Sequence, residues 1–358
     1  MKQLQFVFVH GLSGWGSYDV QYERMPYWGM RNGDLIRLLN SKGYPSYAAS
    51  VAPRGSAWDR ACELYAQLAG TRTDYGKAHC EQCRHERYGP DFTGRGLIPW
   101  MDAEHPLVLT GHSFGGVTVR LFAHLMAYGC PEEQEATDPD DLSPFFKGGH
   151  ADLIFGIMAL AAPHNGTTAY DLFEDPSFDA NAVKVPPLSR QFAKLMTMNN
   201  RVVPDGRAAE DYASYEMHID IADRINQTIK TLPDTYYFSV PCSFTKKKGN
   251  VQYPEAGKME PLFAKTSAQM GAYTGTTKGG MVINASWQEN DGLVNTISAK
   301  APSHAPSGPF DPNKIEPGIW NIMPVWHGDH MSLQGGLFRK HEVSSFYLEM
   351  AERFTSLL

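Results

Sequence analysis

Residues 111–116, Gly-His-Ser-Phe-Gly-Gly, constrain the fold of this chain more than any other stretch. They follow a short apolar run at 107–109 and precede a run with helical character from 117 to 128. A strand, a sharp turn and a helix around a Gly-x-Ser-x-Gly motif form a nucleophile elbow, which exposes a serine hydroxyl above a parallel sheet. Glycines suit this turn because side chains in so tight a bend would clash with the backbone. The motif string alone is weak, but its context predicts that Ser113 is a nucleophile.

Strand-like and helix-like segments alternate along the chain. The strand-like segments are at 6–9, 47–51, 107–109, 153–160 and 235–240. The helix-like segments are at 34–40, 57–68, 117–128 and the amphipathic C-terminal stretch 343–357. This alternation predicts an α/β fold with a mostly parallel central sheet flanked by helices. The chain has 358 residues, 42% hydrophobic and 20% charged, and we predict a single domain over 1–358.

Composition excludes several classes of partner. The chain carries 32 basic and 39 acidic residues, a net charge of −7, and it has no basic tract suited to phosphate backbones, which excludes nucleic acid. The longest apolar stretches are too short to cross a bilayer, so we expect no transmembrane segment. No signal peptide is visible, so the sequence is that of an intracellular protein or of a mature form. The cysteines are Cys62, Cys80, Cys83, Cys130 and Cys242, and an odd number does not indicate a disulfide framework.

A serine nucleophile needs a base to remove its proton and an acid to orient that base. In folds with this elbow, the acid and the histidine follow the serine in the chain. Asp291 lies in a polar turn at 289–292, and His330 lies in a loop shortly before the last helix-like segment. We predict Ser113 as nucleophile, His330 as general base and then acid, and Asp291 as the orienting acid.

Other residues compete for these roles. His327 lies three residues before His330 and is the main competing base, and Asp329 and Glu289 are the competing acids. His112 adjoins the serine, but the elbow geometry directs it away, so we expect it to be a buried support.

The negative charge that develops on the substrate oxygen needs two backbone N–H donors. We predict that Phe114, directly after the nucleophile, supplies one. The other is expected from the loop after the first strand, His10-Gly11-Leu12, with Leu12 as the donor.

Several blocks of the sequence, taken together, resemble one family. They are residues 10–16, 27–29, 58–63, 74–76, 162–168 and 289–296. The chain resembles the bacterial family I.5 lipases, the thermoalkalophilic zinc-containing lipases, and their staphylococcal relatives. The resemblance covers nearly the whole chain and implies an α/β-hydrolase fold with a helical lid, hydrolysis of carboxylic esters, and the triad named above.

The resemblance also implies a structural zinc ion held by two aspartates and two histidines. The corresponding residues here are Asp59, His79, His85 and Asp211. Four such ligands form a closed tetrahedral site that would stabilise a long insertion, here 54–100. Cys80 and Cys83 lie between the two histidines, and thiolates bind zinc well, so they are the alternative ligands.

Four further expectations follow from the resemblance. Ser332 stands where the family has an acidic calcium ligand, and no aspartate follows, so we expect no calcium. The lid is expected within 165–232, with Phe192, Leu195 and Met196 on a helix-like stretch, and it is shorter than in the large members. A short lid favours an open site for short- to medium-chain esters, acylglycerols and polyesters, met at an oil–water or polymer interface. Family members are mostly secreted, which favours an extracellular location.

The leading hypothesis is therefore a lipase or carboxylesterase that forms an acyl-enzyme at Ser113. One alternative is a metal-dependent hydrolase in which an ion at His79 and His85 activates water. The other is a catalytically inactive binding protein that retains the fold. A chelator would abolish activity at once in the first alternative but would only lower thermal stability in the leading hypothesis.

Overall fold

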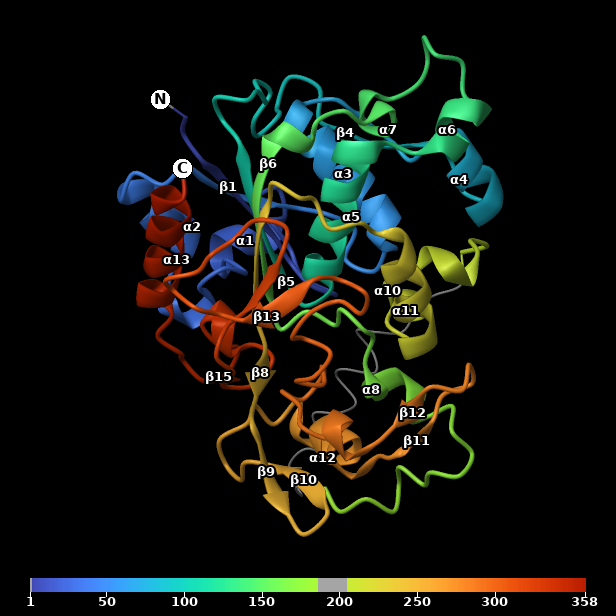
Figure 1. Cartoon of the computed structure of the whole chain (residues 1–358), viewed down its shortest axis with the longest axis vertical. Coiled ribbons are helices and arrows are strands. Elements are labelled where there is room, and N and C mark those ends of the chain that lie inside the picture. The colour runs from blue at the N-terminus through green and yellow to red at the C-terminus, as the bar shows by residue number, and fades with distance from the viewer. Residues whose placement is uncertain (1, 186–204) are drawn as a thin grey trace.

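The computed structural model describes residues 2–185 and 205–358, and its centre is a seven-stranded sheet in which every neighbouring pair is parallel (Figure 1). The strand order is β13-β14-β7-β6-β5-β1-β2. In that order the strands are Ser307–Pro309, Trp320–Ile322, Tyr236–Val240, Ile154–Leu160, Leu107–His112, Gln5–Val9 and Ser46–Ala49. This sheet confirms the predicted α/β fold class.

Helices cover both faces of the sheet, so its central strands are buried on both sides. Along β1, Phe6 and Phe8 face one layer, whereas Val7 and Val9 face the other. The first layer is α2 (Leu35–Ser41) and α13 (Ser344–Ser356), and the second is α3 (Ala57–Ala69) and α5 (Phe114–Tyr128). Figure 1 shows the two layers on opposite sides of the strands.

The predicted elements are present with small shifts at their ends. The strand expected at 47–51 is Ser46–Ala49, because the next two backbone N–H groups leave the sheet: Ser50 donates to Gln67 Oε1 and Val51 donates to His10 Nε2. Strands β13 and β14 were not predicted. Each has only three residues, too few to show an apolar period.

Most of the remaining elements form two groups beside this core. The group near α3 and α5 contains β3 (Arg72–Asp74), α4 (Lys77–Cys83), β4 (Tyr88–Asp91), α6 (Pro131–Ala136), α7 (Pro144–Lys147), η3 (Ala209–Asp211), α10 (Ala213–Glu216) and α11 (Ile219–Thr228). The group at the lower end of Figure 1 contains α8 (Thr168–Asp171), β9 (Thr245–Lys248), β10 (Val251–Pro254), α12 (Ala264–Ala272), β11 (Gly275–Thr276) and β12 (Val282–Ile283).

Shorter elements complete the chain. They are α1 (Val20–Arg24), β8 (Cys242–Ser243), β15 (Trp326–His327), and the short 3-10 turns η1 (Met30–Asn32), η2 (Ala151–Leu153), η4 (Ala285–Trp287) and η5 (Ser332–Gln334). Within the described ranges, none of the helices is both long enough and apolar enough to span a membrane.

Candidate active site and metal cluster

Ser113 occupies the turn between β5 and α5 with a strained backbone. Its φ is 54° and its ψ is −129°, a conformation that costs a residue with a side chain on the order of 1–3 kcal/mol. The flanking glycines are required by close packing. A Cβ on Gly111 would lie 2.3 Å from the Gly115 carbonyl oxygen, and one on Gly115 would lie 2.2 Å from that of Val9. Because β5 leads straight into α5 here, the elbow presents the serine at the carboxyl edge of the sheet.

His330 and Asp291 form a buried pair at the same edge. His330 Nδ1 is 2.8 Å from Asp291 Oδ2, and the two side chains are 4% and 1% exposed. Asp291 Oδ1 accepts hydrogen bonds from the backbone N–H of Leu293 and of Val294, at 3.0 and 2.8 Å. The His330 backbone N–H also donates to the Asp291 carbonyl at 2.9 Å. The carboxylate is therefore locked in the orientation that a base-orienting acid needs.

Two of the three competing residues, His327 and Asp329, have other partners. His327 is 65% exposed and lies 3.3 Å from Glu255 Oε1. Asp329 accepts from the backbone N–H of Glu260 at 2.8 Å, and burial is the main cause that raises its pKa to about 6. Glu289 is half-buried. The geometry thus brings together His330 and Asp291.

His112 supports the site from below. Its Nε2 is 2.9 Å from the His330 carbonyl oxygen and its Nδ1 is 2.6 Å from the Tyr27 hydroxyl. The Tyr27 hydroxyl in turn accepts from the Gly11 N–H at 3.2 Å. Burial, and then the neighbouring His330, lower the pKa of His112 well below its usual value, so the ring is neutral. This assigns the proton to Nε2, which donates to His330, while Nδ1 accepts from Tyr27.

The loop after β1 lies against the serine, as the oxyanion prediction requires. A Cβ on Gly11 would be 2.8 Å from the Ser113 Cβ. The Phe114 N–H belongs to the first turn of α5, where backbone donors have no acceptor within the helix. Leu12 packs beside Phe114 in a small apolar cluster with Val117 and Met217.

Arg60 is a buried support that sequence reasoning missed. Its guanidinium donates to the carbonyl oxygens of His10 and Ala52 and, at 2.9 Å, to the Thr118 hydroxyl. It therefore ties the loop after β1 to α3 and α5. Its position next to Asp59 in a family-like block was the only sequence signal for such a role.

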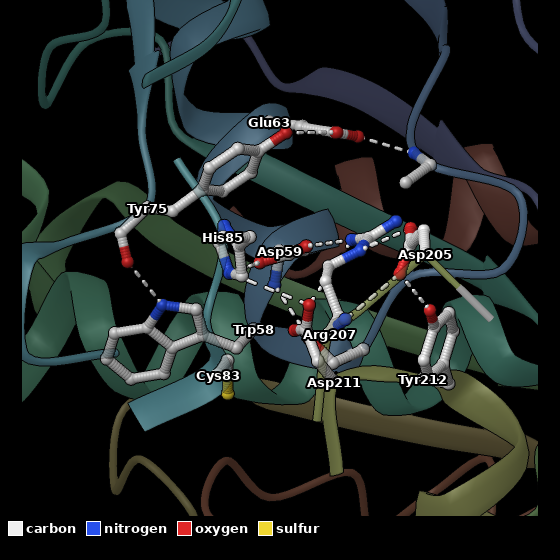
Figure 2. A network of polar contacts seen from close by, with 12 residues as sticks. Trp58, Asp59, Glu63, Tyr75, Cys83, His85, Asp205, Arg207, Asp211 and Tyr212 are labelled. Atoms are coloured by element: carbon white, nitrogen blue, oxygen red, sulfur yellow. Dashed lines mark hydrogen bonds and ion pairs between the residues drawn. The ribbon is translucent and has the colours of Figure 1, made fainter. Parts of the chain in front are cut away.

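The four residues predicted to hold zinc lie together although three separate segments supply them. Figure 2 shows Asp59, His85 and Asp211 of this cluster side by side. His79 Nε2 is 3.3 Å from Asp59 Oδ1 and 3.3 Å from Asp211 Oδ1. His85 Nε2 is 3.7 and 3.5 Å from oxygens of the same two carboxylates. Asp59 is on the first turn of α3, His79 is on α4, His85 follows α4, and Asp211 ends η3.

The cluster fits a tetrahedral metal ion. Bonds of about 2.0–2.1 Å would set neighbouring ligand atoms about 3.3–3.4 Å apart, close to the observed spacing. Asp59 Oδ1 and the Nε2 atoms of both histidines are buried and have no hydrogen-bond partner within the described part of the chain. Such atoms are costly unless an ion binds them. The Trp58 ring stacks on His79 and holds its plane.

Neighbouring side chains also hold the two carboxylates of the cluster in place. Arg207 Nη1 is 3.3 Å from Asp59 Oδ2 and 3.2 Å from Asp211 Oδ2, and Ser56 donates to Asp211 Oδ1 at 3.0 Å. Asp211 falls inside the range predicted for the lid, but the structure places it beside α3 and α4. The predicted lid residues Phe192, Leu195 and Met196 lie outside the described residues.

Comparisons with known proteins agree with this architecture. A family model described as "Lipase-like, C-terminal domain" matches residues 2–356. The lipase of Staphylococcus hyicus is 31% identical over 379 aligned positions, which cover 97% of this chain and 57% of that protein. The chain thus spans little more than half the length of this relative.

Two solved structures match this chain over most or all of the length of both proteins. EstA from Clostridium botulinum has a TM-score of 0.84 at 30% identity, covering 99% of this chain and 87% of that one. Lipase 1 from Pelosinus fermentans has a TM-score of 0.80 at 31% identity and covers 100% of both chains. Together with the family match, the similarity to the Staphylococcus hyicus lipase confirms the predicted relationship to the staphylococcal lipases.

Proposed function

The chain belongs to the lipase-like family, and from this premise we propose that it is a serine carboxylic ester hydrolase, a lipase or carboxylesterase that acts through an acyl-enzyme at Ser113. The observation that carries the proposal is the buried His330–Asp291 pair at the sheet edge where the strained Ser113 turn lies. The similarity to structures called EstA and lipase supports the same reaction class.

In the proposed mechanism, Ser113 Oγ attacks the ester carbonyl carbon while His330 Nε2 takes the hydroxyl proton. Asp291 stabilises the imidazolium that forms. The N–H groups of Phe114 and Leu12 stabilise the negative oxygen of the tetrahedral intermediate. His330 then protonates the leaving alcohol, and a water molecule activated by His330 releases the acid.

We propose acylglycerols, other short- to medium-chain esters and polyesters as substrates. The half-buried Leu12, in the loop that lies against Ser113, packs on a buried apolar cluster that contains Phe114 and Met217, and this apolar surface supports an apolar acyl group. The lid role of 165–232 and action at an oil–water or polymer interface are parts of this proposal. So is an extracellular location, which secretion into the culture medium would test.

We assign the Asp59, His79, His85 and Asp211 cluster to a structural zinc ion that stabilises the insertion 54–100. With four protein ligands, a tetrahedral ion has no open position for water, which favours a structural over a catalytic role. The absence of calcium stays a prediction. Added calcium should leave the activity unchanged.

The first test is hydrolysis of p-nitrophenyl esters of increasing acyl length by the unaltered chain and by Ser113→Ala. We expect activity in the first and a loss of at least about a thousandfold in kcat in the second. The chain-length profile separates an esterase from a lipase. Equal rates in both proteins would refute the serine mechanism, and an additional loss of activity on adding a chelator would then favour the metal-dependent alternative.

A further inference from the structure

Two cysteine side chains lie behind the histidine pair of the metal cluster. Cys83 Sγ is 3.8 Å from His79 Nδ1, and Cys80 Sγ is 3.7 Å from His85 Nδ1. Both cysteines are on α4 and both are buried. Residues four apart share a helix face, so the spacing from His79 to Cys83 brings their side chains together.

The ring orientations decide which nitrogen carries the proton. Both histidines direct Nε2 at the carboxylates, so for metal binding Nδ1 must carry the hydrogen. His85 Nδ1 has the Glu86 carbonyl as its acceptor at 2.9 Å, and the Cys80 thiol donates to the same oxygen at 3.5 Å. For His79, the acceptor at Nδ1 within the described residues is the Cys83 sulfur.

We propose that Cys83, assisted by Cys80, is the outer shell of the zinc centre. The Cys83 sulfur accepts the Nδ1–H of His79 and holds the ring with Nε2 aimed at the ion. This inference rests on the zinc site assigned above and deepens it. Groups that orient a metal-bound imidazole in this way are typically worth about 10–100-fold in metal affinity.

The same geometry argues against the thiols as ligands. The two nitrogens of an imidazole point away from each other, so an ion bound at Nε2 lies across the ring from a sulfur at Nδ1. Two carboxylates and two imidazoles already supply the four ligands that zinc prefers. Figure 2 shows the Cys83 sulfur apart from the carboxylates of Asp59 and Asp211.

The role of Cys83 is tested by zinc affinity, measured on the full chain by competition with a chromophoric chelator. Cys83→Ala should weaken zinc binding about 10–100-fold. Cys80→Ala should have a smaller effect because the Glu86 carbonyl still accepts from His85. The matched control is Cys62→Ala, which removes another buried thiol one turn from Asp59 and should change the affinity less than about threefold.

A second readout uses the unaltered chain and holds even if a variant fails to fold. The protein loaded with Co²⁺ should show the visible bands of a tetrahedral ion without a near-ultraviolet thiolate-to-cobalt band. A thiolate band, or a Cys83→Ala affinity equal to that of the unaltered chain, would overturn the outer-shell role alone. If the unaltered chain took up neither zinc nor cobalt, the assigned centre itself would fail, and this inference with it.

Discussion

At the scale of single residues, the Tyr27 hydroxyl links the loop after β1 to the end of β5 through Gly11 and His112. Tyr27→Phe leaves both buried partners unpaired, at about 1–3 kcal/mol for each group. Because His112 also bonds the His330 backbone, we expect kcat on a soluble p-nitrophenyl ester to fall about tenfold with little change in KM. Steady-state kinetics would check this.

The control for this prediction is Tyr22→Phe. Tyr22 lies on α1 and is half-buried, and its hydroxyl donates to Asp34, the residue that caps α2, at 3.2 Å. The Tyr22→Phe variant should keep the kcat and KM of the unaltered chain. If Tyr27→Phe behaved the same way, the hydroxyl would have no positioning role.

Glu63 gives a pH-dependent prediction at the same scale. Burial, the largest cause, raises its pKa from 4.5 to about 7, while hydrogen bonds from Tyr75 and Ala52 lower it (Figure 2). The folded state therefore binds this proton more tightly than the unfolded chain. That stabilisation is complete below about pH 4.5 and is lost as the pH rises through about 7.

Glu63→Gln removes the titration and can still accept from Ala52. The variant should therefore gain stability relative to the unaltered chain as the pH rises from 5 to 8, by about 2 kcal/mol of unfolding free energy. This gain should appear as a growing difference in melting temperature. Thermal melts followed by circular dichroism across this range would measure it. A difference that stays constant with pH would contradict the assignment.

At the scale of elements, α4 depends on a cap from another helix. The residue at its N-cap position is Gly76, which has no side chain to cap the helix. The buried Glu133 carboxylate of α6 instead accepts from the backbone N–H of Ala78 and of His79, at 3.0 and 2.7 Å. Glu133→Ala should destabilise the protein by about 1–2 kcal/mol. It should also weaken zinc binding, because His79 lies in the turn that Glu133 caps. Denaturant unfolding and zinc titration would check both effects, and the exposed Glu135→Ala on the same helix should show neither.

Elements with a clear apolar period were predictable, and those defined by tertiary contacts were not. The continuous apolar runs of β1 and β6 and the period of α13 were sufficient for their prediction. The first turn of α5 was missed because Phe114, Gly115 and Gly116 are defined by the elbow and not by helix propensity. Strands β13 and β14 exist because a neighbouring strand supplies their partners.

The candidate site likewise contains residues that the sequence predicted and residues that it did not. Chain order led to His330 and Asp291, which the fold brings together. Asp211 follows His85 at a long sequence distance, so only the family resemblance identified it. No local pattern marks Arg60 or Tyr27, because burial and a partner distant in the chain define their roles.

At the scale of the whole molecule, α3 links the Asp59–His79–His85–Asp211 cluster to the sheet edge where the Ser113 turn lies. Asp59 belongs to the cluster, while the next residue, Arg60, donates a hydrogen bond to the loop after β1. The position of α3 does not depend on the ion alone. Ser56 caps its first turn, and the Glu216 carboxylate accepts from the Ala57 N–H at 2.8 Å. Loss of the ion should therefore loosen α4 and η3 before it displaces the oxyanion loop.

Removal of zinc by a chelator should accordingly lower the stability of the protein but leave its activity nearly unchanged. We expect the melting temperature to fall by on the order of 10 °C, because a structural ion contributes several kcal/mol of folding free energy. The initial rate on a soluble ester at 25 °C should stay within about twofold, since the His330–Asp291 pair and its support His112 remain hydrogen-bonded to one another. Differential scanning calorimetry and a paired rate assay would measure both, with added zinc restoring the melting temperature. An immediate loss of activity without unfolding would instead assign the chemistry to the ion, and the serine would no longer be the centre of the mechanism.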